Sequence, residues 1–405
     1  MENSILIQNG IVIDGTGSAP YKASVLVGNG RIDAVFKEGL PPDLNPQQLV
    51  DAKGKYVLPG IIDCHVHVMI DAYRFTEQLS TPFSLNFYKA IDHCNRLLRA
   101  GITTARDAGG ADFGVKKALE MGLIKGPELQ ISISILSTTG GHVDAWLPSG
   151  TQSHLLLPPY PGHPSGICDG PMEVRKRVRE VLRSGADCIK VCSTGGVMGP
   201  NDHPEFTQFT VAELNIMVEE ARMRKGKKVM AHAQGLEGIK NAIRAGVHSI
   251  EHGIFLDDEA IDLMLENNVF LVPTLLAVHS VIEGDYPTQV VDRAKAVFDT
   301  HRESIAKAHK AGVKIAMGTD SGVMGHGKNM EELRLMCEVG MSPMESIVAS
   351  TKTAAECLGI VDRTGTLEIG KQADMLVLDA NPLEKISSLG RDGNMAHILQ
   401  KGTLI

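Results

Sequence analysis

The chain has 405 residues, of which 43% are hydrophobic, and carries a formal net charge of −8 with a pI near 6.0. Its length permits one large domain with a smaller companion, and its acidic balance argues against a groove for nucleic acid or a surface for anionic membranes. Seven cysteines, an odd number in so long a chain, predict reduced and mostly buried thiols. No run approaches the ~20 apolar residues of a membrane span, and no signal peptide is evident, so we expect a cytoplasmic protein with no membrane partner.

Residues 1–58 are predicted to be all-β. The runs "SILIQNGIVIDG", "ASVLVGNGRIDAVF" and "KYVL" are short, rich in β-branched residues and separated by Asn-Gly and similar turn dipeptides. Residues 359–405 show the same character in "GTLEIGKQADMLVLDANP" and "HILQKGTLI". Two β-rich ends around a different middle predict that both termini combine into one small composite β-sandwich domain.

Residues 59–358 have a different pattern, in which short apolar runs alternate with amphipathic stretches such as "TVAELNIMVEEARMRKG" and "DDEAIDLMLENN". This alternation indicates an α/β fold with a parallel sheet, and eight units predict a closed (β/α)8 TIM barrel. An open doubly wound sheet is the alternative. The candidate strands lie within residues 60–68, 101–110, 128–136, 186–192, 227–233, 248–253, 270–275 and 314–322.

One connection is unusually long. Residues 137–172 are rich in Pro and Gly and show no helical period, and loops of this length inside a compact domain are usually functional or disordered. Because the loop follows the third candidate strand, we expect it to lie over the C-terminal mouth of the barrel, where such folds build their active sites.

Two histidines separated by one residue are the first candidate metal ligands of the predicted barrel. His65 and His67 lie in the apolar run "GIIDCHVHVM", and residues two apart on a strand face the same side. Two buried imidazoles need two partners, and neutral imidazole is the commonest protein ligand for metals. His232, His252 and Asp320 end later candidate strands, so the set predicts nitrogen and oxygen ligands for Zn²⁺ or a similar divalent ion.

Lys190 lies between Ile189 and Val191 in "DCIKVC". A lysine at a strand end can extend its amine toward solvent from an apolar wall. A neutral lysine near a metal cluster has another possibility, because it can take up CO2 as a carbamate whose two oxygens bridge two cations.

The combined motifs resemble the amidohydrolase superfamily of metal-dependent hydrolases. The resemblance is carried by the six polar residues above together with "VLPGIIDCHVH" and "GTLEIGKQADMLVLD". The motifs "TGGHVD", "SIEHG" and "GTDSG" are most similar to the prolidase-like branch, with its Xaa-Pro and other aminoacyl-amino-acid dipeptidases, carboxypeptidases and imidazolonepropionase-related proteins. That branch also includes enzymes acting on amides, ureas or carbamates of foreign compounds.

The resemblance implies two divalent metal ions, expected to be zinc. His65, His67 and Asp320 would hold one ion, and His232 and His252 the other. Lys190 as its carbamate would bridge the two, together with a hydroxide. Asp320 would accept the proton of the hydroxide and transfer it to the leaving amine, which is general acid–base catalysis.

Further residues are expected to contact the substrate. His142, which follows two glycines on the long loop, would polarise the substrate carbonyl by the same resemblance; a solvent-exposed loop histidine is the alternative. Gln234 stands where close relatives often carry an aromatic hydroxyl or a histidine, and an amide cannot titrate. His326 and Lys328 are expected either to meet a substrate carboxylate or simply to cap the next helix.

Other polar residues have more ordinary interpretations. Asp63 is expected either to orient a ligand or to form core hydrogen bonds. Glu251 and His248 are predicted to be structural. Glu251 precedes His252 on the same strand, so its side chain is expected to point to the opposite face. His154, His163 and His203 lie in loops and are expected to be exposed to solvent.

These observations predict a binuclear hydrolase, expected to be a homo-oligomer, that cleaves an amide bond in a small N-acyl or aminoacyl amino acid, like a dipeptidase or carboxypeptidase. One alternative is a cyclic amide, aryl urea, carbamate or amide-linked toxin as the substrate. A non-catalytic scaffold on the same fold is a remote alternative, because every expected ligand is present. Lys190 argues against a mononuclear deaminase-type enzyme.

Overall fold

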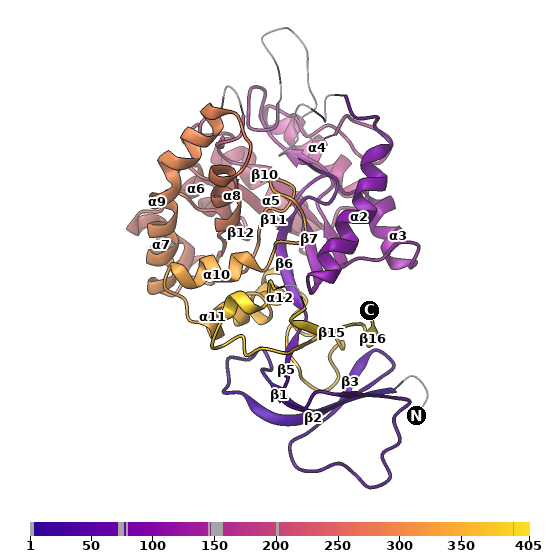
Figure 1. Cartoon of the computed structure of the whole chain (residues 1–405). Helices are drawn as coiled ribbons and strands as arrows, with labels where there is room; N and C mark the ends of the chain where they lie inside the picture. Colours follow the sequence, from indigo (N-terminus) through magenta and orange to yellow (C-terminus); the bar gives the residue numbers. More distant parts are fainter. Residues whose placement is uncertain are drawn as a thin grey trace.

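The computed structural model describes residues 4–71, 77, 80–144, 146, 157–199, 202–391 and 393–405. Figure 1 shows a sheet that holds both ends of the chain below a larger region, in which helices surround a group of strands.

The lower sheet combines strands from both ends of the chain. Its order is β16-β15-β14-β5-β1-β2-β3, and β4 pairs with β1. The ends meet where β5 pairs antiparallel with β14, with Leu58 opposite Leu376. Buried side chains from both ends, including Val25, Val57 and Leu399, form one apolar cluster. The strands are β1 Ser4–Val12, β2 Tyr21–Gly28, β3 Arg31–Phe36, β4 Gln48–Asp51, β5 Tyr56–Pro59, β14 Met375–Leu378, β15 Met395–Gln400 and β16 Thr403–Leu404.

The upper region holds two parallel sheets. One has the order β6-β7-β8 and the other β13-β12-β11-β10-β9. Their strands are almost wholly buried, as expected when helices cover parallel strands. The strands are β6 Ile61–Val66, β7 Ile102–Asp107, β8 Glu128–Ile131, β9 Ile135–Leu136, β10 Cys188–Cys192, β11 Lys228–Ala233, β12 Ser249–His252 and β13 Phe270–Val272.

Two of the eight predicted strands differ in the structure. The segment 128–136 divides at Ile133, whose φ of 65° breaks the strand, so that β8 pairs with β7 and β9 with β10. The segment 314–322 forms isolated bridges only, from Ile315 to β13 and from Ser321 to β6. The described strands therefore do not form one continuous ladder, in contrast to the expected closed barrel.

Helices flank the parallel strands, and their ends follow local sequence signals. Thr210 and Glu213 form a capping box at the start of α5, and the Asp257 side chain caps α7. The helices are α2 Leu85–Arg99, α3 Phe113–Glu120, α4 Gly170–Arg183, α5 Val211–Met223, α6 Leu236–Arg244, α7 Asp258–Glu266, α8 Leu275–Glu283, α9 Thr288–Ala311, α10 Glu331–Glu338, α11 Pro343–Ala349 and α12 Lys352–Leu358. None of the helices in the described part of the chain is long and apolar enough to cross a membrane.

Part of the 137–172 loop lies outside the described residues, including His154. His163 is buried and stacks on Tyr160, with ring centroids 5.0 Å apart, so the expectation that it is exposed is wrong. The reason is an aromatic cluster, in which Tyr160 also packs against Phe83 and Phe87. His203 is exposed as predicted. All seven cysteines are free thiols and all but Cys337 are buried, which agrees with the sequence expectation.

Candidate active site

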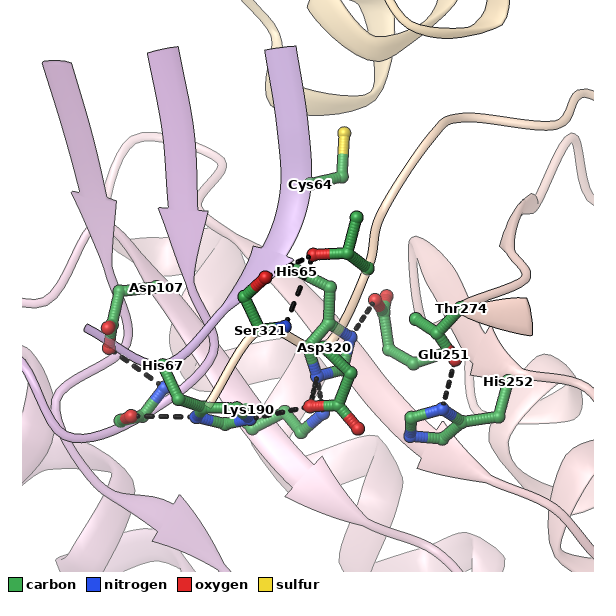
Figure 2. A network of polar contacts seen from close by, with 12 residues as sticks. Cys64, His65, His67, Asp107, Lys190, Glu251, His252, Thr274, Asp320 and Ser321 are labelled. Atoms are coloured by element: carbon green, nitrogen blue, oxygen red, sulfur yellow. Dashed lines mark hydrogen bonds and ion pairs between the residues drawn. The ribbon is translucent and has the colours of Figure 1, made fainter. Parts of the chain in front are cut away.

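The six predicted ligands come together near the C-terminal ends of the parallel strands, and Figure 2 shows His65, His67, Lys190, His252 and Asp320. They arrive from four strands and from the irregular segment after β13, and each of them is buried. These residues are His65 of β6, His67 just beyond it, Lys190 of β10, His232 of β11, His252 of β12, and Asp320.

Three of these residues bring their ligand atoms to one point. The Nε2 atom of His67 lies 3.1 Å from Oδ1 of Asp320, and the Nε2 atom of His65 lies 3.4 Å from the same oxygen. All three ligand atoms lie within 4.8 Å of one another. Lys190 adjoins this group, because its Nζ atom lies 3.3 Å from Nε2 of His65.

The other ring nitrogen of each histidine fixes its tautomer. The Nδ1 atom of His67 donates to the carbonyl of Gly109 at 2.8 Å, and Nδ1 of His65 donates to Oε2 of Glu251 at 2.7 Å. Both Nε2 atoms therefore present lone pairs to the Asp320 carboxylate. Acceptors that face one another in this way need a cation between them, and this donor set with buried partners on the far nitrogens is typical of a divalent metal.

A second pair of histidines stands next to the first group. His232 donates from Nε2 to the carbonyl of Gly195 at 3.0 Å, which leaves its Nδ1 atom as the free ligand. His252 pairs its Nδ1 atom with the Thr274 hydroxyl at 2.6 Å, which leaves Nε2. The two ring centroids are 4.4 Å apart. Two lone pairs alone make an incomplete metal site.

Burial keeps three of the four histidines in the neutral form that ligation requires. Loss of water lowers the pKa of His65, His232 and His252 well below the ordinary histidine value. Burial also lowers the pKa of Lys190, which favours the neutral amine that can react with CO2. Burial also acts to lower the pKa of His67. The neighbouring Asp320 carboxylate has the larger effect and raises that pKa, because a proton on Nε2 of His67 can be shared with the carboxylate oxygen.

The backbone is strained at these positions. His252, Asp320 and Thr274 have φ values of 75°, 62° and 48°, a region that residues other than glycine rarely adopt. Such strain is concentrated at functional sites. Gly318 allows the Asp320 segment to pass under β6, because a Cβ atom there would lie 3.0 Å from Cβ of His65.

Two buried carboxylates hold the ligands in place. Glu251, which was expected to be structural, orients His65 and also accepts from Nη2 of Arg106 at 3.0 Å. Asp63 accepts from the backbone N–H groups of His65 and Thr319, and from the Thr319 hydroxyl, so it fastens β6 to the segment before Asp320. The interpretation of Asp63 as an orienting residue fits this geometry. The role of Glu251 was missed because its partner comes from another strand.

His142 lies over the second histidine pair. Its ring stacks on His232 with centroids 4.2 Å apart, and its Nδ1 atom lies 2.6 Å from Oδ2 of Asp202. Asp202 also accepts from the backbone N–H of Gly196. The carboxylate therefore fixes the imidazole in position above the site. Sequence reasoning did not find Asp202, because 60 residues separate it from its partner and no local motif marks it.

The other residues that were predicted to contact the substrate lie in different places. Gln234 is buried near His232, and its Oε1 atom has no hydrogen-bond partner among the described residues. His326 is also buried but lies against His93 and Asp71. Lys328 is exposed, so the structure does not bring it together with His326.

A cavity of about 650 Å³ opens at the opposite end of the strands. Its lining includes Lys228 and His248, which stand where β11 and β12 begin. His65, His67, His232 and His252 lie at or near the other ends of their strands, so this cavity is separate from the site. His248 donates to the carbonyl of Cys357, in agreement with its predicted structural role.

Comparison with known proteins is consistent with this geometry. The model of the amidohydrolase family matches residues 56–405. The chain belongs to the amidohydrolase family. It is 35% identical to the ochratoxinase of Aspergillus niger over 98% of this chain and 86% of that protein.

Two solved structures are similar over nearly the whole chain. A Xaa-Pro dipeptidase with methionine bound in its active site has a TM-score of 0.90 and 34% identity, with 99% of each chain covered. A prolidase complexed with N-methylphosphonate-L-proline has a TM-score of 0.91 and 34% identity, again with 99% of each chain covered. This amidohydrolase is thus a metal-binding hydrolase that acts on C–N bonds, in the prolidase-like branch of the superfamily.

Proposed function

We propose that this amidohydrolase cleaves the amide bond of a small N-acyl or aminoacyl amino acid at a centre of two divalent metal ions. The observation that carries the proposal is the convergence of His65, His67 and Asp320 on one point, with the outer nitrogens of both histidines already engaged. The similarity to a Xaa-Pro dipeptidase and to a prolidase with a bound proline analogue supports the choice of substrate.

The proposed ligand set uses all six residues. His65, His67 and Asp320 would hold one ion, and His232 and His252 the second, and Lys190 as a carbamate would supply oxygen ligands. Zinc suits these nitrogen and oxygen donors. Two bound divalent ions supply a water of lowered pKa and polarise the scissile carbonyl.

Side chains of the protein then transfer the proton and stabilise the negative charge that develops. Asp320 accepts a proton from the attacking water and delivers it to the leaving nitrogen as the C–O bond forms and the C–N bond breaks. His142 donates a hydrogen bond to the carbonyl oxygen as negative charge develops there. Asp202 holds the His142 ring in the orientation that this requires.

We also propose a domain division that accords with this site. Residues 1–58 and 359–405 form a composite β-sandwich, and residues 59–358 a (β/α)8 barrel in which the two parallel sheets are arcs. Backbone hydrogen bonds from Ala316 to Leu271 and from Cys64 to Met317, both 2.9 Å, support closure through the 314–322 segment.

Metal content and turnover test the centre. We expect about two tightly bound ions per chain in the reconstituted protein and near-total loss of activity in Lys190→Ala and Asp320→Asn. Elemental analysis after dialysis against a chelator, followed by addition of Zn²⁺, measures both properties. Lys310→Ala is the control, because this exposed lysine of α9 is not one of the proposed site residues. Full turnover by metal-free protein contradicts the proposal.

A substrate panel tests the bond that is cleaved. The panel contrasts Xaa-Pro and other dipeptides and N-acyl amino acids, each with a free or blocked C-terminus, with aryl amides, aryl ureas and ochratoxin. We expect kcat/KM to be highest for substrates with a free carboxylate. Because the ochratoxinase of Aspergillus niger is 35% identical over nearly the whole chain, an amide-linked toxin is the second candidate. A preference for the toxin, or for an aryl urea, replaces the dipeptide proposal while leaving the metal centre intact.

A further inference from the structure

A second cluster of metal-ligand side chains lies outside the proposed binuclear centre. It consists of Asp71, which follows β6, His93 of α2, and His326 of the loop before α10. One carboxylate oxygen and one nitrogen from each histidine lie within 4.8 Å of one another, and all three residues are buried. We refer to these three residues as the outer cluster.

His93 has the arrangement of a metal-binding histidine. Its Nδ1 atom donates to the carbonyl of Val68 at 2.8 Å, which fixes the tautomer and leaves a lone pair on Nε2. That Nε2 atom lies 3.3 Å from Oδ1 of Asp71. The two acceptors face one another as His67 and Asp320 do in the main centre. An outer hydrogen bond to a backbone carbonyl is common among histidines that ligate metals.

His326 supplies a second, independent sign of a missing partner. Its side chain is only 6% exposed, yet neither ring nitrogen has a hydrogen-bond partner among the described residues. Oδ1 of Asp71 is likewise without a hydrogen bond there. Buried polar groups nearly always have partners, and when two lack one at the same place an ion or a water is expected between them.

The charges around the outer cluster are compatible with a cation. Lys89 binds Oδ2 of Asp71 at 2.9 Å and leaves Oδ1 available. Its positive charge opposes a metal and predicts an affinity below that of the main centre.

We propose that Asp71, His93 and His326 bind a third divalent transition-metal ion, such as Zn²⁺, that has a structural role. The rings of His93 and His326 stack with centroids 4.2 Å apart and an angle of 28° between their planes, so the two imidazoles lie side by side at this site. The ion ties the segment after His67 to α2 and to the loop after Asp320. It therefore holds together the two segments that carry the first metal's ligands. This inference goes beyond the proposed function and does not depend on which substrate is cleaved.

Metal binding to the full-length chain tests the site. Zn²⁺ content after equilibrium dialysis is measured for the wild type, His326→Gln, His93→Gln and Asp71→Asn, with Lys328→Ala as the matched control on the same loop. We expect each cluster variant to bind one equivalent less than the wild type and the control. Co²⁺ provides a second readout, because its visible absorption reports the loss of a site with nitrogen ligands even if one variant folds poorly.

Two further variants separate this site from the main centre and from water. In an Asp320→Asn background, added Zn²⁺ is expected to raise the Tm, and this rise should vanish when His326→Gln is added. Lys89→Met removes the competing charge and is expected to tighten Zn²⁺ binding at the third site. Equal metal contents in the wild type and all three cluster variants, or unchanged affinity in Lys89→Met, would show that the outer cluster holds only water and would overturn the proposal.

Discussion

At the residue scale, the chemistry depends on which ring nitrogen each histidine presents to the site. His65 and His67 present Nε2 because Glu251 and Gly109 take their Nδ1 protons. His232 presents Nδ1, because its Nε2 proton goes to Gly195. Single hydrogen bonds to buried acceptors thus decide how each ligand is aimed, and none of these partners is adjacent in sequence to the histidine that it orients.

The pair formed by His142 and Asp202 gives a prediction at this scale. Removing the carbonyl donor in His142→Ala is expected to lower kcat by about 10²–10³-fold. Asp202→Asn keeps the ring but weakens its orientation, and we expect a smaller loss, about 10–100-fold, with KM little changed. Steady-state kinetics on one good substrate measures both. Unchanged kcat in both variants, at normal Tm and metal content, would remove His142 from the mechanism.

At the element scale, the 314–322 segment departs from regular strand geometry where it positions the Asp320 carboxylate. Asp320 has a φ of 62°, and Thr319 and Asp320 both direct their backbone N–H groups to the carbonyl of His65. A regular strand cannot do this, which is why only isolated bridges form there. The predicted eighth strand is therefore present as a hydrogen-bonded segment between β13 and β6 rather than as a continuous strand.

Gly318 tests how tightly this segment is packed. A Cβ atom there would lie 2.4 Å from Cγ1 of Val272 and 3.0 Å from Cβ of His65. Gly318→Ala is therefore expected to cost about 1–3 kcal/mol of unfolding free energy through overpacking and to weaken metal binding by displacing His65. Gly390→Ala is the control, because a Cβ at that position meets its neighbours at 3.4 Å. Urea unfolding and metal titration are the measurements; wild-type values in Gly318→Ala contradict the prediction.

At the scale of the whole molecule, the two ends of the chain are joined in one sheet. Leu399 of β15 is fully buried in a cluster with Val25 and Val57, residues more than 340 positions away in sequence. The last residues of the chain therefore contribute to the stability of the first strands, and the parallel sheets are inserted between the two halves of this sheet.

Truncation of one buried side chain measures this connection. Leu399→Ala is expected to lower the free energy of unfolding by about 2–5 kcal/mol, through lost burial and the cavity left behind. Leu49→Ala, at a leucine that is 60% exposed, should change it by less than about 0.5 kcal/mol. Chemical denaturation compares the two variants. Equal effects would mean that the C-terminal strands are not integral to the sheet.

Much of the candidate site could be read from local patterns. The two-residue spacing of His65 and His67, and the positions of His232, His252 and Asp320 at the ends of apolar runs, predicted that these residues would meet. They do so because parallel strands bring their carboxyl ends to one face of the fold. Helix starts such as those of α5 and α7 were equally readable, since a cap depends on residues three or four positions apart.

What the sequence by itself determined is therefore the alternation of strands and helices, the β character of both ends and the residue types that can bind metal. Only the tertiary structure decided that Glu251 orients His65, that Asp202 supports His142 and that His326 lies with His93 and Asp71 instead of with Lys328. Local patterns follow from the geometry of the backbone over a few residues. These contacts join positions as many as 255 residues apart, and their existence depends on how the packed strands and loops bring side chains together.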